Sequence, residues 1–173
     1  DFLDWPSNAN KPAMKAGTQA LMMMAIKAGS ELCSHLDEET MATRCEERYA
    51  KMVEVAPKIV EQYFLEAKHP TAPGSKQAAA LMALAGILDA EKANAEVLSI
   101  EGARGFSTFY GYYMLQAMVK AGNYEGAMQV IRDFWGGMLD MGATSFWEDF
   151  NIDWLPNAAP IDELVPEGKK DIH

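Results

Sequence analysis

Two short stretches of the sequence place a tryptophan directly beside carboxylates. In "GATSFWEDF", Trp147 precedes Glu148 and Asp149. In "DFLDWPSN", Asp4 precedes Trp5. Indole rings stack on the apolar C–H faces of sugars, and carboxylates accept hydrogen bonds from sugar hydroxyls. Both stretches are therefore candidates for part of a carbohydrate-binding site.

The chemistry that such residues can perform is glycoside hydrolysis. It needs a pair of carboxyl groups, one that protonates the leaving oxygen and one that activates water or attacks the sugar. A carboxylate held against an indole is partly desolvated, which raises its pKa. The plain alternatives are that the loop carboxylates are solvated and that Trp5 packs as a hydrophobic staple. The recurrence of the pair where a loop meets a helix favours a functional role.

Other kinds of site leave no trace in the pattern. The histidines, His35, His69 and His173, lie near loops, and no HExxH, CxxC or His/Asp cluster is present, so we expect no metal site. The glycines of "WGGMLDMG" follow a helix instead of preceding one, so they predict no phosphate loop and no cofactor. Cys33 and Cys45 fall on apolar stripes and are predicted to be buried free thiols, with a bridge between them as the alternative.

Composition limits the class of protein. The chain has 173 residues of which 49% are apolar, enough for one globular domain with a core. The net charge of −10 argues against nucleic acid or an anionic membrane as partner. No run of 18 apolar residues predicts a membrane span.

Nearly every long segment has the residue spacing of a helix. The first begins at Asn10 as a cap, and its consecutive apolar residues at 21–26 predict burial on several sides. The second is amphipathic, and Pro57 should kink it near Val53. Residues 154–173 hold three prolines and predict an irregular tail. The expected helices cover 10–36, 36–67, 76–87, 90–98, 108–121 and 124–139.

The alternation of mostly apolar and amphipathic helices predicts an all-α fold of antiparallel helical hairpins in two layers. The same pattern is typical of a solenoid or toroid, in which each hairpin packs against its neighbours. Inner helices that lack some neighbours would leave more exposed apolar surface than a monomer normally shows, through which the chain could self-associate.

One long string carries a family resemblance. "YMLQAMVKAGNYEGAMQVIRDFWGGMLDMGATSFWEDF" resembles the late part of the catalytic domain of bacterial α-L-rhamnosidases. The early "DWPS", followed by an Ala- and Leu-rich helix, resembles the same family's "DW" segment. The likeness follows most of the chain in order and is strongest over residues 106–150 and weakest over 30–73.

The resemblance implies an (α/α)6 toroid of six helical hairpins that hydrolyses terminal α-L-rhamnosides with inversion and without a metal or organic cofactor. Glu148 matches the family's general base, which activates water, and Trp5 matches a tryptophan that lines the sugar pocket. Together with the residue chemistry above, Asp4 and Trp147 join Trp5 as predicted substrate contacts. Asp149 is expected to support the base.

The departures from the family pattern predict a fragment. The family's general acid lies in an acidic motif upstream of "DW", and neither it nor the His-rich segment after the base is present. About six helices stand where the toroid needs twelve. Residues 1–173 are therefore expected to form one partial domain, about half of the toroid, inactive without the remainder of a larger enzyme. The family implies a secreted or periplasmic location, although the sequence itself does not show the compartment.

Two other readings stay open. "AGNYEGAMQVI" resembles one tetratricopeptide helix, and paired helices also fit a non-enzymatic helical-repeat interaction module. Such arrays repeat about every 34 residues, however, and the pattern occurs once. The remaining alternative is another six-hairpin glycosidase, or a binding relative that has lost catalysis, because fold alone does not determine function.

Overall fold

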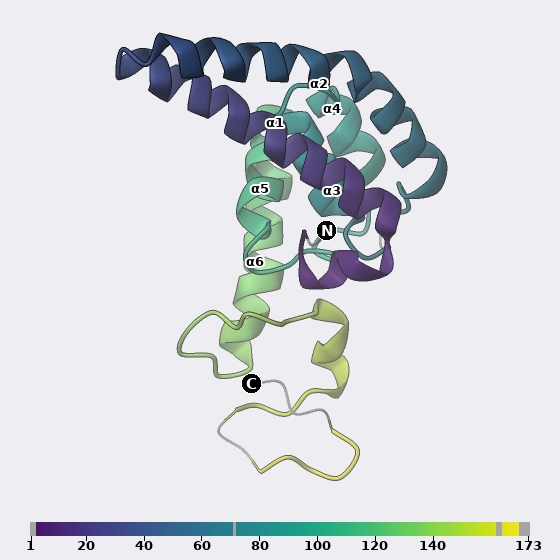
Figure 1. The fold of residues 1–173 in the computed structure, drawn as a ribbon. Coiled ribbons are helices and arrows are strands. Elements are labelled where there is room, and N and C mark those ends of the chain that lie inside the picture. Colours follow the sequence, from purple (N-terminus) through teal and green to yellow (C-terminus); the bar gives the residue numbers. More distant parts are fainter. Residues whose placement is uncertain (1–2, 71, 162–163, 170–173) are drawn as a thin grey trace.

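The computed structural model describes residues 3–70, 72–161 and 164–169, and its regular structure is helical, with loops between the helices (Figure 1). No β-strand occurs within the described residues, which confirms the predicted all-α class. Two 3₁₀ helices and one π-helical turn supplement the α-helices. In chain order the elements are η1 (Trp5–Ala9), α1 (Lys11–His35), α2 (Glu39–Glu66), α3 (Ser75–Leu84), α4 (Ala90–Ala93), η2 (Asn94–Leu98), α5 (Gly111–Lys120), α6 (Tyr124–Asp140) and η3 (Ile152–Asn157).

Helices α1 and α2 form a long antiparallel hairpin (Figure 1). The side chain of Asn10 caps α1 by accepting a hydrogen bond from the Ala13 N–H at 3.2 Å, as its residue type predicts. A tight turn containing Asp37, with φ of 58°, reverses the chain. Helix α2 continues through Pro57 and curves along its length. Pro57 has no backbone N–H to donate within the helix, and a helix can bend where this hydrogen bond is missing.

The turn end of this hairpin extends beyond the other helices (Figure 1). Every buried residue of α1 lies between Ala13 and Met23, because α3 packs only against the first half of the helix. The apolar run at 21–26 is therefore not buried on several sides in this chain. Met23 is fully buried, whereas its neighbour Met22 is 47% exposed.

Helix α3 is the centre of the fold. Every residue from Ser75 to Ala83 is buried, and the helix contacts α1, α4 and α5. Its run of alanines has no polar face, because all of its sides face protein and the small side chains let the neighbours approach closely. Gly74, with φ of 75°, precedes the helix, and any side chain there would collide with Ser7.

Helix α5 packs against α3, α6 packs against α5, and the two carry much of the core. The tight turn before α6 is closed by Asn123, whose side chain accepts a hydrogen bond from the Gly126 N–H at 3.0 Å. The prediction for α6 holds in part: Ala127, Phe134 and Met138 of the predicted inner face are buried, whereas Tyr124, Met128 and Ile131 are exposed. The fully buried large residues of the two helices are Met114, Met118, Phe134 and Met138.

Two local predictions were incomplete. Residues 90–98 form a short α-helix that continues as a π-helix over Asn94–Leu98, with wider backbone hydrogen bonding than an α-helix. The irregular tail does not begin at 154, because Ile152–Asn157 forms a 3₁₀ helix whose first turn is capped by the Asn151 side chain. The sequence spacing does not distinguish these tighter and wider turns from α-helix or loop.

Candidate functional site

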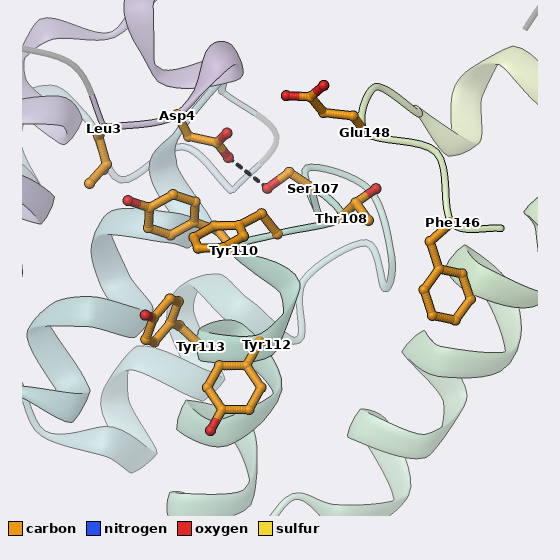
Figure 2. Close-up of a pocket in the computed structure, with 10 residues that line it drawn as sticks. Leu3, Asp4, Ser107, Thr108, Tyr110, Tyr112, Tyr113, Phe146 and Glu148 are labelled. Carbon is orange, nitrogen blue, oxygen red and sulfur yellow. Dashed lines mark hydrogen bonds between the residues drawn. The ribbon is translucent and has the colours of Figure 1, made fainter. Parts of the chain in front are cut away.

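A pocket of about 710 Å³ lies where the start of the chain, the beginning of α5 and the loop after α6 meet (Figure 2). It brings together Asp4 and Glu148, which come from nearly opposite ends of the sequence. Most of the remaining wall is aromatic. The lining residues are Leu3, Asp4, Ser107, Thr108, Phe109, Tyr110, Tyr112, Tyr113, Phe146 and Glu148.

Asp4 is held firmly from several directions. Its backbone N–H donates to Ser7 Oγ at 2.9 Å, and the same hydroxyl donates to the Asp4 carbonyl at 2.7 Å, which fixes the entry into η1. The carboxylate oxygen Oδ2 accepts hydrogen bonds from Ser107 Oγ at 2.6 Å and from Gln77 Nε2 at 3.3 Å. The residue is only 8% exposed, so these bonds satisfy a nearly buried charge.

Glu148 has the opposite environment. It lies on the loop after α6, it is exposed, and it forms no hydrogen bond or ion pair with any residue that the structure describes. Figure 2 shows its carboxylate turned toward the side of the pocket where Asp4 and Ser107 lie. Asp149, the next residue, is also exposed but is not part of the pocket wall.

The loop that carries Glu148 is anchored through Trp147. The backbone carbonyl of Trp147 accepts a hydrogen bond from Thr108 Oγ1, which lies just before α5. The half-buried Trp147 ring packs against Phe150, with 5.8 Å between the ring centroids, and does not line the pocket. In this chain the indole therefore supports the loop, and its predicted contact with substrate stays a prediction.

Tyrosines and phenylalanines form the rest of the wall. Tyr110 is almost buried, and burial together with the nearby Asp4 carboxylate raises its pKa, so the hydroxyl stays protonated at neutral pH. The ring of Tyr113 lies 5.6 Å from that of Tyr110. Phe109 and Tyr112 are 70% and 60% exposed, which leaves flat apolar surface free to contact a ligand.

Sequence reasoning identified part of this pocket. Asp4 and Glu148 both line it, whereas the side chain of Trp5 lies outside what the structure describes. The segment "FSTFYGYY", which supplies six of the ten lining residues, was interpreted only as the boundary between a loop and a helix. Its density of aromatic residues beside serine and threonine was the signal that could have marked it.

Other types of site are not apparent. Among the described residues, no group of three or more His, Cys, Asp or Glu side chains could hold a metal ion. Cys33 and Cys45 are free and half-buried, so the thiols are not joined across the α1–α2 turn. Within the same residues, no helix is both long and apolar enough to cross a membrane.

Comparison with protein-family models, with curated proteins and with solved structures found no match. One carboxylate is fixed among hydrogen-bond donors, one is open to solvent, and aromatic rings lie around both. This arrangement suits a polar ligand that also has flat apolar faces, and a sugar has both properties.

Proposed function

We propose that this chain supplies part of the active-site pocket of an inverting glycoside hydrolase that acts on terminal α-L-rhamnosides. The proposal depends on one observation, the presence of Asp4 and Glu148 in the same aromatic pocket. Two acid–tryptophan segments that are far apart in the sequence contribute their carboxylates to it. The resemblance of the segment that contains Glu148 to α-L-rhamnosidases adds the choice of sugar.

In this proposal Glu148 is the general base. Its carboxylate is exposed and has no partner among the described residues, so a water molecule can reach it. An inverting glycosidase needs such a group on one face of the sugar ring, about 6.5–9.5 Å from the general acid, because the attacking water stands between base and sugar. Asp149 would only support the loop.

Asp4 has the properties of a group that binds and orients the sugar. The hydrogen bonds from Ser107 and Gln77 fix the direction of its carboxylate, which can then accept a hydrogen bond from a sugar hydroxyl in a defined place. The rings of Tyr110 and Phe109 offer faces for the apolar side of the sugar. The indoles of Trp5 and Trp147 remain predicted substrate contacts.

The general acid is proposed to come from the rest of a larger catalytic domain, so these residues alone would be inactive. Exposed apolar side chains on α5 and α6 outside the pocket mark where further helices would pack; they include Val119, Met128, Ile131 and Leu139. A helical-repeat module is less well supported, because α1 and α2 contain 25 and 28 residues whereas α3 and α5 contain 10 each, and repeat arrays have similar units.

The test is the stereochemistry of hydrolysis by the larger enzyme. An aryl α-L-rhamnoside should be cleaved, and proton NMR should detect β-L-rhamnose as the first sugar released. The Glu148→Gln enzyme is the control that assigns the activity to this pocket. The first appearance of the α-anomer, or failure to cleave this substrate while another aryl glycoside is cleaved, would contradict the proposal.

A further inference from the structure

Lys76, in the first turn of α3, is a completely buried lysine. Its ammonium donates to the backbone carbonyls of Ile100 at 2.8 Å and Gly102 at 2.6 Å, and it lies 5.2 Å from the centre of the Phe106 ring. Within the described part of the chain it forms no ion pair with a carboxylate. A buried charge is costly unless it is hydrogen-bonded, so this one is compensated mainly by the loop at 99–106.

The backbone of that loop needs such support. Glu101 has φ of 55°, in the left-handed region that residues with a side chain rarely adopt, whereas Gly102 and Gly105, with φ of 57° and 78°, adopt it readily. Conformations of this kind persist when the surroundings hold them. Gly105 lies beside the Lys76 stem and the Pro70 carbonyl, where an added Cβ would crowd the carbonyl oxygen at 3.2 Å and make ordinary contact with the stem. The loop therefore wraps around the lysine.

The same loop leads into the pocket. Ser107, Thr108, Phe109 and Tyr110, which follow it directly, all line the pocket. Gln77, the residue after Lys76 on α3, donates to Ser107 Oγ at 3.4 Å and to the Asp4 carboxylate at 3.3 Å. Two consecutive residues of the buried helix thus hold the loop at Ile100 and Gly102 and the first residue of the wall, Ser107.

We propose that Lys76 is a positioning residue for the pocket: by holding the carbonyls of Ile100 and Gly102, it sets where the wall at 107–110 stands. The inference concerns the shape of the pocket, so it does not require the rhamnosidase proposal. Burial lowers the pKa of Lys76 to about 8 while the nearby Glu101 opposes the change, so the lysine is mostly charged at pH 7. Its hydrogen bonds to the loop are accordingly of the strong, charge-assisted kind.

The experiment compares two lysine-to-methionine variants of the whole protein by hydrogen–deuterium exchange. Lys76→Met keeps the apolar stem and removes both loop bonds. Lys120→Met is the matched control, because Lys120 also donates to one backbone carbonyl, that of Ala83 at 2.8 Å, but lies outside the pocket. Exchange over 99–110 should rise by about tenfold or more in Lys76→Met only, as the loss of charge-assisted bonds predicts. Exchange in α1 and α2 should not change.

Uniformly faster exchange across all helices would overturn the proposal, because Lys76 would then be a general stabiliser, and unchanged exchange at 99–110 would overturn it equally. If Lys76→Met does not fold, Gly105→Ala strains the same loop, because a side chain is disfavoured at its φ of 78° and would crowd the Pro70 carbonyl, and it should give the same local pattern. Steady-state kinetics of the larger enzyme are a separate measurement. In Lys76→Met, KM for an aryl α-L-rhamnoside should rise by a larger factor than kcat falls. Absence of hydrolysis by the wild-type larger enzyme would refute the proposed function and leave the exchange result to decide on Lys76.

Discussion

The two acid–tryptophan segments have similar residue types and opposite environments. Asp4 is nearly buried and accepts hydrogen bonds from Ser107 and Gln77. Glu148 is exposed and has no partner among the described residues, although the loop that carries it is fastened through Trp147. Hydrogen bonds fix the carboxylate itself in the segment that contains Asp4, whereas they fix only the backbone in the segment that contains Glu148.

This difference fits the two roles that we propose for the carboxylates, sugar binding for Asp4 and base catalysis for Glu148. A carboxylate whose position is fixed by donors can define where a ligand hydroxyl binds, but its hydrogen-bonding capacity is partly used. A carboxylate on an anchored loop with a free head group can bind and activate water. The pocket contains one hydrogen-bonded carboxylate and one open to solvent, and the proposed binding and base roles require this difference.

The largest expected effect tests the free carboxylate. In the larger enzyme, Glu148→Gln should lower kcat by about 10²–10⁴-fold, the usual contribution of a general base, and leave KM nearly unchanged because the amide has the same shape. Azide, which needs no deprotonation, should partly restore turnover. Asp149→Asn is the matched control and should have little effect. Near-normal turnover of Glu148→Gln together with an inactive Asp149→Asn would transfer the role of base to Asp149.

The next effect concerns Lys76, whose charged group, like that of Asp4, is buried and fixed by hydrogen bonds. Its pKa is lowered from 10.5 to about 8 in the folded protein, so between these values the unfolded chain binds more protons than the folded one. The free energy of unfolding contributed by this group should therefore rise with pH, by about 1.4 kcal/mol per unit between pH 8 and 10. Denaturant titrations of wild type and Lys76→Met should diverge by this slope. Parallel pH profiles would show that burial does not penalise the ammonium.

A smaller effect tests the held carboxylate directly. Asp4→Ala should lower the free energy of unfolding by about 1–3 kcal/mol, because Ser107 and Gln77 lose a buried acceptor. Glu148→Ala, the matched change at the exposed carboxylate, should stay within about 0.5 kcal/mol of wild type. Urea denaturation measures both. Equal losses for the two variants would remove the distinction between held and free carboxylates.

The helices were predictable where one side faces water. The spacing of apolar residues in α2 and the cap at Asn10 are local signals that the structure confirms, and the spacing in α6 is confirmed in part. Helix α3 was predicted only as a short helix, because a run of alanines has no amphipathic face to reveal that it is central. The π-helical turn at Asn94–Leu98 has no local signal that we recognise.

The pocket was predictable only in part because its contacts are not local. Asp4 and Glu148 stand out as acids beside tryptophans, but nothing in the sequence pairs Asp4 with Ser107, which is 103 positions further along the chain. Gln77 and Lys76 sit on a helix without polar periodicity, so their roles depend on which neighbours the fold brings to them. Aromatic residues before α5 are equally typical of a core.

The long sequence separation between Asp4 and Ser107 has a consequence for folding during synthesis. Asp4 leaves the ribosome 103 residues ahead of Ser107, so this partner emerges only after α1, α2 and α3 have been made. Until then the carboxylate remains hydrated, and the α1–α2 hairpin can form through its own local contacts. Closure of the chain start over α3 must therefore be a late step, and the pocket forms at the end of assembly.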